Sequence, residues 1–357
     1  MVCRPAICSH SLGRAWVHSL PSKLDQVAKF GFDVELFYED LLYAAKELSH
    51  NDRPTPKDLV AAAHHTRSLC DERGIAIVCL QPFMHYEGLR DRRKHEQRIH
   101  EMKLWIQLVG ILDTHIIAIP STFLPEREAS GDLGIVVQDL REVVDLGALH
   151  GIQFAYESLA WGTYSDTWEQ AWKIVQAVDR PNFGICLDTF NMAARVFADP
   201  AASSRKTLGA DAEMAASIGR LVRKIDVRKI VYVQVVDAEK LAEPLVEGHP
   251  YYVSSQPARM SWSRNCRLFY GEEERGAYLP VKAIMKAILV DLGFEGWVSA
   301  EMFNESLADA RPSVPQEHAE RAAVSWRKIL EDVALDEQTI RSSSSKTVSD
   351  QHMRAQL

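Results

Sequence analysis

The segment FGICLDTFN, residues 183–191, ends an apolar run on a single carboxylate, Asp188. The same pattern, an apolar β-like run that closes on an acidic or amide residue, recurs in IQFAYESL, IVYVQVVD and GWVSAEMFN, which contain Glu157, Gln234 and Glu301. A buried polar group costs free energy unless it is paired. Four repeats of this pattern therefore indicate four side chains with a shared task.

Strand-like and helix-like segments alternate along the chain, which is the pattern of parallel βα units. The expected strands cover residues 5–9, 33–37, 75–81, 115–120, 152–157, 183–188, 230–236 and 296–301. The expected helices cover residues 22–30, 55–72, 91–112, 133–148, 167–178, 208–224, 281–291 and 316–333. This order predicts an α/β fold, a (β/α)8 TIM barrel. In such a barrel the carboxyl ends of the strands meet at one mouth, where active sites lie.

A single domain, residues 1–333, is expected to hold this barrel. The long insertion 237–280 follows a strand, so it is expected to cover the mouth as a lid. A connection of this length is usually functional or disordered, and its aromatic and basic residues favour a packed element. The polar, Ser-rich segment 334–357 is expected to be a disordered tail.

The composition is that of a soluble globular protein, with 46% hydrophobic and 25% charged residues. A net charge of −8 without a basic run argues against a nucleic-acid partner. No stretch approaches the roughly 18 apolar residues that cross a membrane, and the N-terminus lacks a secretory signal pattern. Six scattered cysteines without a CxxC pair favour a reducing compartment, so a cytoplasmic location is expected.

The four strand-end residues suggest a metal site. Three carboxylates and one amide oxygen that meet at the barrel mouth would form a cage made only of oxygen atoms, which suits a hard divalent cation. Zinc would more usually bring His or Cys ligands. The chain also lacks a GxGxxG motif after the first strand and a P-loop, so no redox cofactor or nucleotide site is expected. The sequence therefore predicts a metal-dependent barrel enzyme.

Longer sequence segments around these positions resemble those of the fungal-type 3-dehydroshikimate dehydratases, which belong to the xylose-isomerase-like TIM-barrel superfamily. The segments are LQPFMHYEGL (80–89), FAYESLAW (154–161), NFGICLDTFN (182–191), YVQVVDAEKL (232–241) and PARMSWSRNCRLFYGE (257–272). The resemblance covers residues 5–333. It implies a small-molecule substrate, 3-dehydroshikimate, which loses water to give protocatechuate in quinate or shikimate catabolism.

The resemblance also implies roles for particular residues. The ion is expected to be Mg2+ or Mn2+, with Co2+ as a further option. Arg267 stands where the superfamily has an Arg whose planar fork would bind the substrate carboxylate, and Arg264 is the alternative. The metal ligands are expected to be Glu157, Asp188, Gln234 and Glu301.

The proton-transferring group stays open. His85 is a candidate general base or substrate-orienting group, and a metal-bound Glu157 or Glu301 is another option. Bacterial relatives tend to carry QPFRDFEG where this chain has QPFMHYEG, and many relatives have His at the positions of Leu159 and Asn191. Asn191 is still a candidate hydrogen-bond partner of the substrate or of a metal ligand.

Two residues near the ends of the first strands, His10 and Glu35, are positioned to line the mouth but are interpreted as structural. A sugar isomerase or epimerase of the same superfamily is the alternative function, since it would share the oxygen cage. It would need two carboxylates that flank the substrate carbon. The oligomeric state stays open, with a homo-oligomer as one option.

Overall fold

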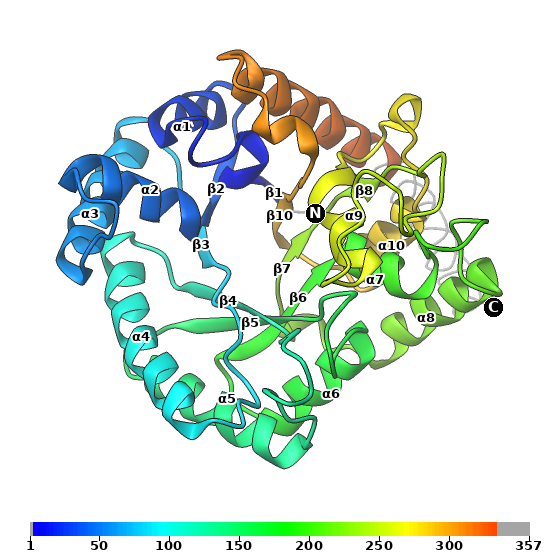
Figure 1. The fold of residues 1–357 in the computed structure, drawn as a ribbon, viewed down its shortest axis with the longest axis horizontal. Helices are drawn as coiled ribbons and strands as arrows, with labels where there is room; N and C mark the ends of the chain where they lie inside the picture. Colours follow the sequence, from blue (N-terminus) through cyan, green and yellow to red (C-terminus); the bar gives the residue numbers. More distant parts are fainter. Residues whose placement is uncertain (1–2, 334–357) are drawn as a thin grey trace, which may run out of the picture.

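The computed structural model describes residues 3–333. Its main sheet is a closed barrel of parallel strands in the order β1-β10-β7-β6-β5-β4-β3-β2 (Figure 1). Every predicted strand is present to within two residues at each end, so the predicted barrel is confirmed. The strands are β1 (Cys3–Cys8), β2 (Asp33–Phe37), β3 (Ile77–Gln81), β4 (Ile116–Pro120), β5 (Gln153–Glu157), β6 (Phe183–Asp188), β7 (Ile230–Gln234) and β10 (Gly296–Ala300).

Helices form a ring around the barrel (Figure 1). The predicted helices are all present, and the one predicted at 281–291 begins as α10 (Val281–Met285) and continues as the π-helical η4 (Lys286–Asp291). The others are α1 (Leu20–Lys29), α3 (Pro56–Glu72), α4 (Arg92–Ile111), α5 (Leu133–Ala148), α6 (Trp168–Val178), α8 (Ala210–Lys224) and residues 314–333.

Two helices beside the barrel were not predicted, α2 (Tyr38–Ser49) and α7 (Thr189–Val196). Each begins at the residue after a strand, so no turn residue separates the strand pattern from the helix pattern. Asp188 explains the second case, because it ends β6 and also caps α7. Its Oδ1 accepts hydrogen bonds from the backbone N–H groups of Phe190 at 2.7 Å and Asn191 at 3.4 Å.

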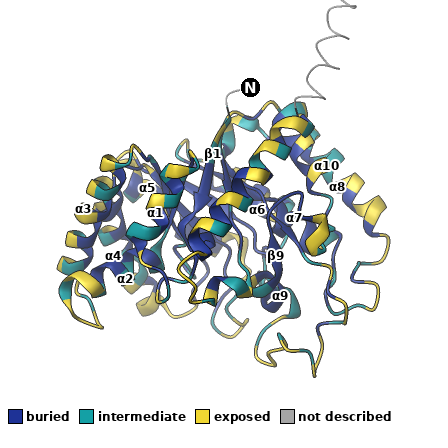
Figure 2. Ribbon diagram, turned by 90° about the horizontal axis from the view of Figure 1, so that it is seen from above, coloured by how far each residue is buried: buried dark blue, intermediate teal, exposed yellow. Residues whose placement is uncertain are grey.

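The core has two layers, which follow from the alternation of side chains along each strand. Large apolar residues on the outer side of the strands pack against the helices, and the strands are buried at the centre of the molecule (Figure 2). Inside the barrel, small residues such as Ala6, Ala118 and Ala155 pack with Cys186 and Tyr232. The inward series continues with Glu35 in the middle of β2 and with the last residues of four other strands, Gln81, Glu157, Asp188 and Gln234.

The insertion 237–280 is an ordered element. It contains the antiparallel pair β8 (Asp237–Ala238) and β9 (Arg267–Leu268), and α9 (Ala258–Cys266). Figure 2 places α9 and β9 at the end of the molecule opposite the start of β1, where the barrel strands finish. The predicted tail 334–357 lies outside the described residues. Within residues 3–333, no helix combines the length and the apolar character needed to cross a membrane.

Candidate active site

Three of the four predicted ligands lie in one hydrogen-bonded cluster at the carboxyl ends of the strands. Asn191 Nδ2 donates to Glu157 Oε1 at 2.7 Å and to Asp188 Oδ2 at 2.8 Å. Arg267 Nη1 donates to Asp188 Oδ2 and to Glu301 Oε2, both at 2.9 Å. All three carboxylates are buried. They converge because β5, β6 and β10 all end at this mouth.

Gln234 lies beside this cluster, since its backbone pairs in register with Asp188. Its Nε2 donates to Glu35 Oε1 at 2.8 Å, and its Oε1 accepts from the Cys186 thiol at 3.4 Å. Glu35 also accepts hydrogen bonds from Tyr232 and Ser299 and is fully buried. Because Glu35 takes an N–H of the amide, it fixes the side on which Gln234 presents its oxygen.

The charge of the cluster fits a divalent cation. The pKa of Glu157 lies well above its usual value because of burial and because Glu301 and Asp188 are close. Burial likewise raises the pKa of Glu301, although Arg267 opposes this rise. One guanidinium cannot offset three buried carboxylates. A divalent cation among these oxygens would favour their ionised forms, and carboxylate and amide oxygens are donors that such ions accept.

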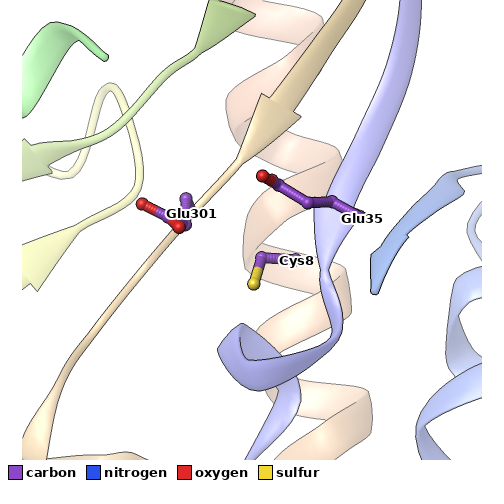
Figure 3. A group of neighbouring side chains, drawn as sticks. All are labelled: Cys8, Glu35 and Glu301. Atoms are coloured by element: carbon purple, nitrogen blue, oxygen red, sulfur yellow. The ribbon is translucent and has the colours of Figure 1, made fainter. Parts of the chain in front are cut away.

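Glu301 also lies near a second group of possible ligands, Cys8 and Glu35. One atom from each of the three residues lies within 4.8 Å of the others, and Figure 3 shows the three side chains facing a common space. Two features argue against a hard cation here. Burial raises the pKa of the Cys8 thiol well above its usual value, and the Glu35 oxygens already accept hydrogen bonds from Tyr232, Gln234 and Ser299. Glu35 is therefore better placed to support Gln234.

A cavity of about 330 Å³ opens above the cluster. Glu157, Glu301 and Gln81 contribute to its lining, whereas Asp188 and Gln234 do not, so they lie behind the cavity surface. Much of the remaining wall is aromatic or basic and includes Trp16, Phe37, Phe123, Trp161, Phe303 and Arg14. This volume is within the range of small-molecule sites, about 300–1,000 Å³.

Arg267 lines the cavity, but most of its fork is engaged. Besides its ion pairs with Asp188 and Glu301, its Nε donates to Ser263 Oγ at 2.9 Å. Its guanidinium also lies over the ring of Phe190, 4.3 Å from the centroid. The predicted bidentate contact with a substrate carboxylate would compete with these partners. Arg264, on α9, is exposed, lines the same cavity and donates to Gln256 Oε1 at 3.1 Å.

The structure places the other two candidates away from the cavity lining. His85 has φ 53° and packs against Phe123 with ring centroids 4.3 Å apart, and Met84 lines the cavity in its place. Burial and the charge of Arg98 lower the pKa of His85 to about 4. Asn191 is buried beneath the cavity and donates to Glu157 and Asp188, so it positions carboxylates.

Sequence reasoning placed His10 near the mouth as a structural residue, but it overlooked Arg14 and Trp16, which follow in the same segment after β1. The short helix η1 (Ser9–Leu12) and the turn after it bring His10, Arg14 and Trp16 to the cavity. The available signal was position, because a segment directly after a barrel strand always lies at the mouth.

Comparison with known proteins agrees with this architecture. A family model described as "Xylose isomerase-like TIM barrel" matches residues 24–329. A Neurospora crassa protein named 3-dehydroshikimate dehydratase is 53% identical over 344 residues, which cover 94% of this chain and 96% of that protein.

Two solved structures share the fold. A xylose isomerase-like TIM barrel/4-hydroxyphenylpyruvate dioxygenase fusion protein superposes with a TM-score of 0.71 at 26% identity, over 96% of this chain and 45% of that one. The IOLI protein, described with a binding zinc atom, gives a TM-score of 0.67 at 17% identity, over 93% of this chain and 98% of that one. From the family model and the Neurospora relative together, the chain belongs to the xylose isomerase-like TIM barrel family.

Proposed function

We propose that this protein is a divalent-metal-dependent 3-dehydroshikimate dehydratase, which removes water from 3-dehydroshikimate to give protocatechuate. The observation that carries the proposal is the buried cluster of Glu157, Asp188 and Glu301 at the floor of a small cavity. The 53% identical Neurospora protein bears the name of this activity and matches nearly the whole chain. The reaction would belong to quinate or shikimate catabolism in the cytoplasm.

The residues proposed to hold the ion are Glu157, Asp188, Gln234 and Glu301. When bound, a Mg2+, Mn2+ or Co2+ ion would polarise the ketone of the substrate and make a neighbouring C–H more acidic. The proposal that this chain uses a metal rests on its donor set. The zinc atom described for the IOLI protein is bound by a different protein, which shares the fold of this chain.

The chain's own groups would then position the substrate and transfer the proton. Glu157 and Glu301 line the cavity, so either carboxylate can reach a substrate C–H, and these two are the proposed bases. We propose that Arg267 acts at the carboxyl ends of the strands, where its positive charge offsets the negative charges of Asp188 and Glu301. His85 packs against Phe123, does not contribute to the cavity lining, and has no direct part in this scheme.

Residues 237–280 are proposed to act as the cover of this cavity. Ser263, Arg264 and Arg267 all come from this insertion and contribute to the lining. Trp262 anchors it, since its ring is fully buried and packs against Phe190 of α7 with ring centroids 5.0 Å apart. The cover therefore brings positive charge to a cavity whose floor is acidic.

Turnover of 3-dehydroshikimate by the full-length protein tests the proposal, because the aromatic product is detected by its absorbance. Metal-loaded protein should produce protocatechuate, EDTA should stop the reaction, and Mn2+, Mg2+ or Co2+ should restore it to different degrees. A flat trace from folded, metal-loaded protein would contradict the proposal. Turnover of a ketose under the same conditions would instead support the isomerase or epimerase alternative.

A further inference from the structure

His10 is a buried polar residue of the cavity that the proposed mechanism leaves unused. It lies on η1, is 2% exposed, and its ring packs between Phe37 and Phe303 with centroids 4.7 Å away in each case. The two phenyl rings hold the imidazole in one orientation. His10 contributes to the lining of the same cavity as Glu157 and Glu301.

Its hydrogen bond to Arg14 determines where the ring proton sits. Arg14 Nη1 lies 3.2 Å from His10 Nε2. A guanidinium can only donate, so Nε2 must accept and the proton of the neutral ring must be on Nδ1. This Nδ1 has no hydrogen-bond partner among residues 3–333. Burial and the charges of Lys23 and Arg14 lower the pKa of His10 well below its usual value, in agreement with a neutral ring.

Two arginines lie with this unpartnered donor at the cavity. Arg14 follows Gly13, which has a φ of 131° that glycine adopts readily and other residues rarely adopt. A Cβ at Gly13 would also lie 2.3 Å from the His18 ring. The backbone N–H of Arg14 donates to Leu307 O at 2.9 Å, which fixes the start of the side chain. Within residues 3–333, neither Arg14 nor Arg264 has a carboxylate oxygen within 4.0 Å of its guanidinium.

The electrostatic environment also favours an anion between these groups. Burial lowers the pKa of both arginines, and the charge of Arg14 lowers that of Arg264 further, so the two guanidinium groups repel one another. Cationic groups without a carboxylate partner in a half-enclosed wall are stabilised by a negatively charged ligand.

We propose that His10 Nδ1–H, Arg14 and Arg264 form the wall that binds the carboxylate of the substrate. The inference rests on the proposed function, since it takes the substrate to be a carboxylic acid. The opposite end of the substrate, with its ketone and hydroxyl groups, would then face Glu157 and Glu301. This arrangement leaves Arg267 with its partners at the strand ends.

One acidic residue, Glu39, lies on the same wall. Its Oε2 is 3.9 Å from His10 Nδ1, beyond hydrogen-bond distance, and burial together with Asp40 raises its pKa. If Glu39 were the natural partner of His10 and Arg14, the wall would be a structural ion cluster. Its substitution therefore separates a structural role from a ligand-binding role.

Calorimetric binding of two ligands to Mn2+-loaded protein tests the inference. Protocatechuate has the carboxylate, and catechol lacks it but keeps the same pair of hydroxyl groups. Wild-type protein should bind protocatechuate more tightly than catechol. Arg14→Met, Arg264→Met and His10→Phe should each reduce the affinity for protocatechuate by about tenfold or more, the effect of 1.4 kcal/mol, and leave catechol binding unchanged. Glu39→Gln should keep the preference or strengthen it.

The controls separate this inference from the proposed function. Arg228→Met removes an exposed arginine near the other end of the barrel, before β7, and should leave both affinities unchanged. If the three wall variants keep the preference for protocatechuate, or lose both ligands equally, the inference is wrong although turnover by the wild type still supports the function. If the wild type neither turns over 3-dehydroshikimate nor prefers the carboxylate, the proposed function itself is wrong.

Discussion

Glu301 is held from two sides at the mouth of the barrel. Gln81 Nε2 donates to its Oε1 at 2.8 Å and Arg267 Nη1 to its Oε2 at 2.9 Å. Both carboxylate oxygens are therefore oriented before any ligand binds. Such prior orientation reduces the cost of binding a cation and lets the same group act on a substrate.

Glu301→Gln should lower kcat/KM by on the order of 100-fold or more, the scale seen when one electrostatic stabiliser is removed from an active site. The fold should be retained, because an amide replaces a buried carboxyl group whose pKa is already raised. Steady-state kinetics and Mn2+ titration measure the effect. Glu295→Gln, at an exposed position just before β10, is the matched control. Normal activity at ordinary metal concentration would remove Glu301 from the ligand set.

Glu87 should make stability depend on pH. Its Oε1 accepts from Thr122 N–H at 2.7 Å and Tyr156 O–H at 3.1 Å, while its Oε2 is buried without a partner. Burial raises the pKa of Glu87 to about 7. A folded pKa above the unfolded one means that the folded state binds the proton more tightly. Protonated Glu87 therefore stabilises the folded state. This contribution is fully present below pH ~4.5 and is lost as the pH rises through about 7.

Glu87→Gln should remove this dependence, since the amide keeps the accepting oxygen and cannot ionise. The difference in unfolding free energy between the variant and the wild type should rise by up to roughly 3 kcal/mol from pH 4.5 to pH 8. Urea unfolding at several pH values measures it. Equal pH slopes for the two proteins would contradict the raised pKa.

At the residue scale, part of the candidate site could be predicted from the sequence and part could not. Glu157, Asp188, Gln234 and Glu301 could be found because a polar residue at the end of an apolar strand is visible in a short window. The surroundings of His10 could not be found in this way. Its neighbours Phe37 and Phe303 lie far from it in the chain, and only the closed barrel brings them together.

At the scale of elements, α1 and α2 are joined by a buried ion pair between Lys23 and Asp40. Both side chains are almost fully buried, and Asp40 Oδ2 also accepts from Ser9 Oγ at 2.7 Å. Removing one member of such a pair leaves the other charge buried and unpaired, which costs about 3–5 kcal/mol. This pair fixes the start of α2 next to the segment that holds His10.

Asp40→Asn should therefore lower the unfolding free energy by about 3 kcal/mol or more, as measured by urea denaturation. The double variant Lys23→Met/Asp40→Leu should recover most of this loss, because neither charge remains. Asp211→Asn, which breaks the exposed pair with Lys206, should change stability by less than about 1 kcal/mol. A single variant as stable as the wild type would show that Lys23 finds another partner.

Elements with conventional boundaries were predictable, and elements without them were not. α3 begins with a capping box at Thr55 and Asp58, after a polar turn that separates it from the preceding segment. α2 and α7 begin at strand ends, so their helical pattern reads as a continuation of the preceding strand. The insertion was predicted as an aromatic and basic segment, but its two-residue strands are too short to leave a pattern.

At the scale of the whole molecule, the order of strands and helices was predictable because the βα period runs through residues 3–333. The geometry of the cavity was not predictable, since it depends on loops from several parts of the chain. Arg267 is one example. Its type suggested a contact with the substrate, whereas its ion pairs with Asp188 and Glu301 follow from the position of β9.

Metal binding should stabilise the entire barrel, because the proposed ligands come from β5, β6, β7 and the end of β10. An ion that binds only the folded state adds RT ln(1 + [metal]/Kd), or about 2.7 kcal/mol when its free concentration is 100 times Kd. Urea unfolding at increasing Mn2+ concentrations measures this gain. Glu301→Gln should show a smaller gain at the same concentration. An unfolding free energy that does not change with Mn2+ would argue against an ion at this position.

Asp188 imposes a practical restriction on genetic experiments with this enzyme. One carboxylate oxygen caps a helix, and the other accepts from Arg267 in the proposed metal site. An alanine allele would damage both at once, so a null phenotype could not be attributed to chemistry alone. An asparagine allele retains an oxygen for the helix start and confines the change to the other side, where it removes the charge and places an amide N–H against Arg267 and Asn191. That makes it the informative choice.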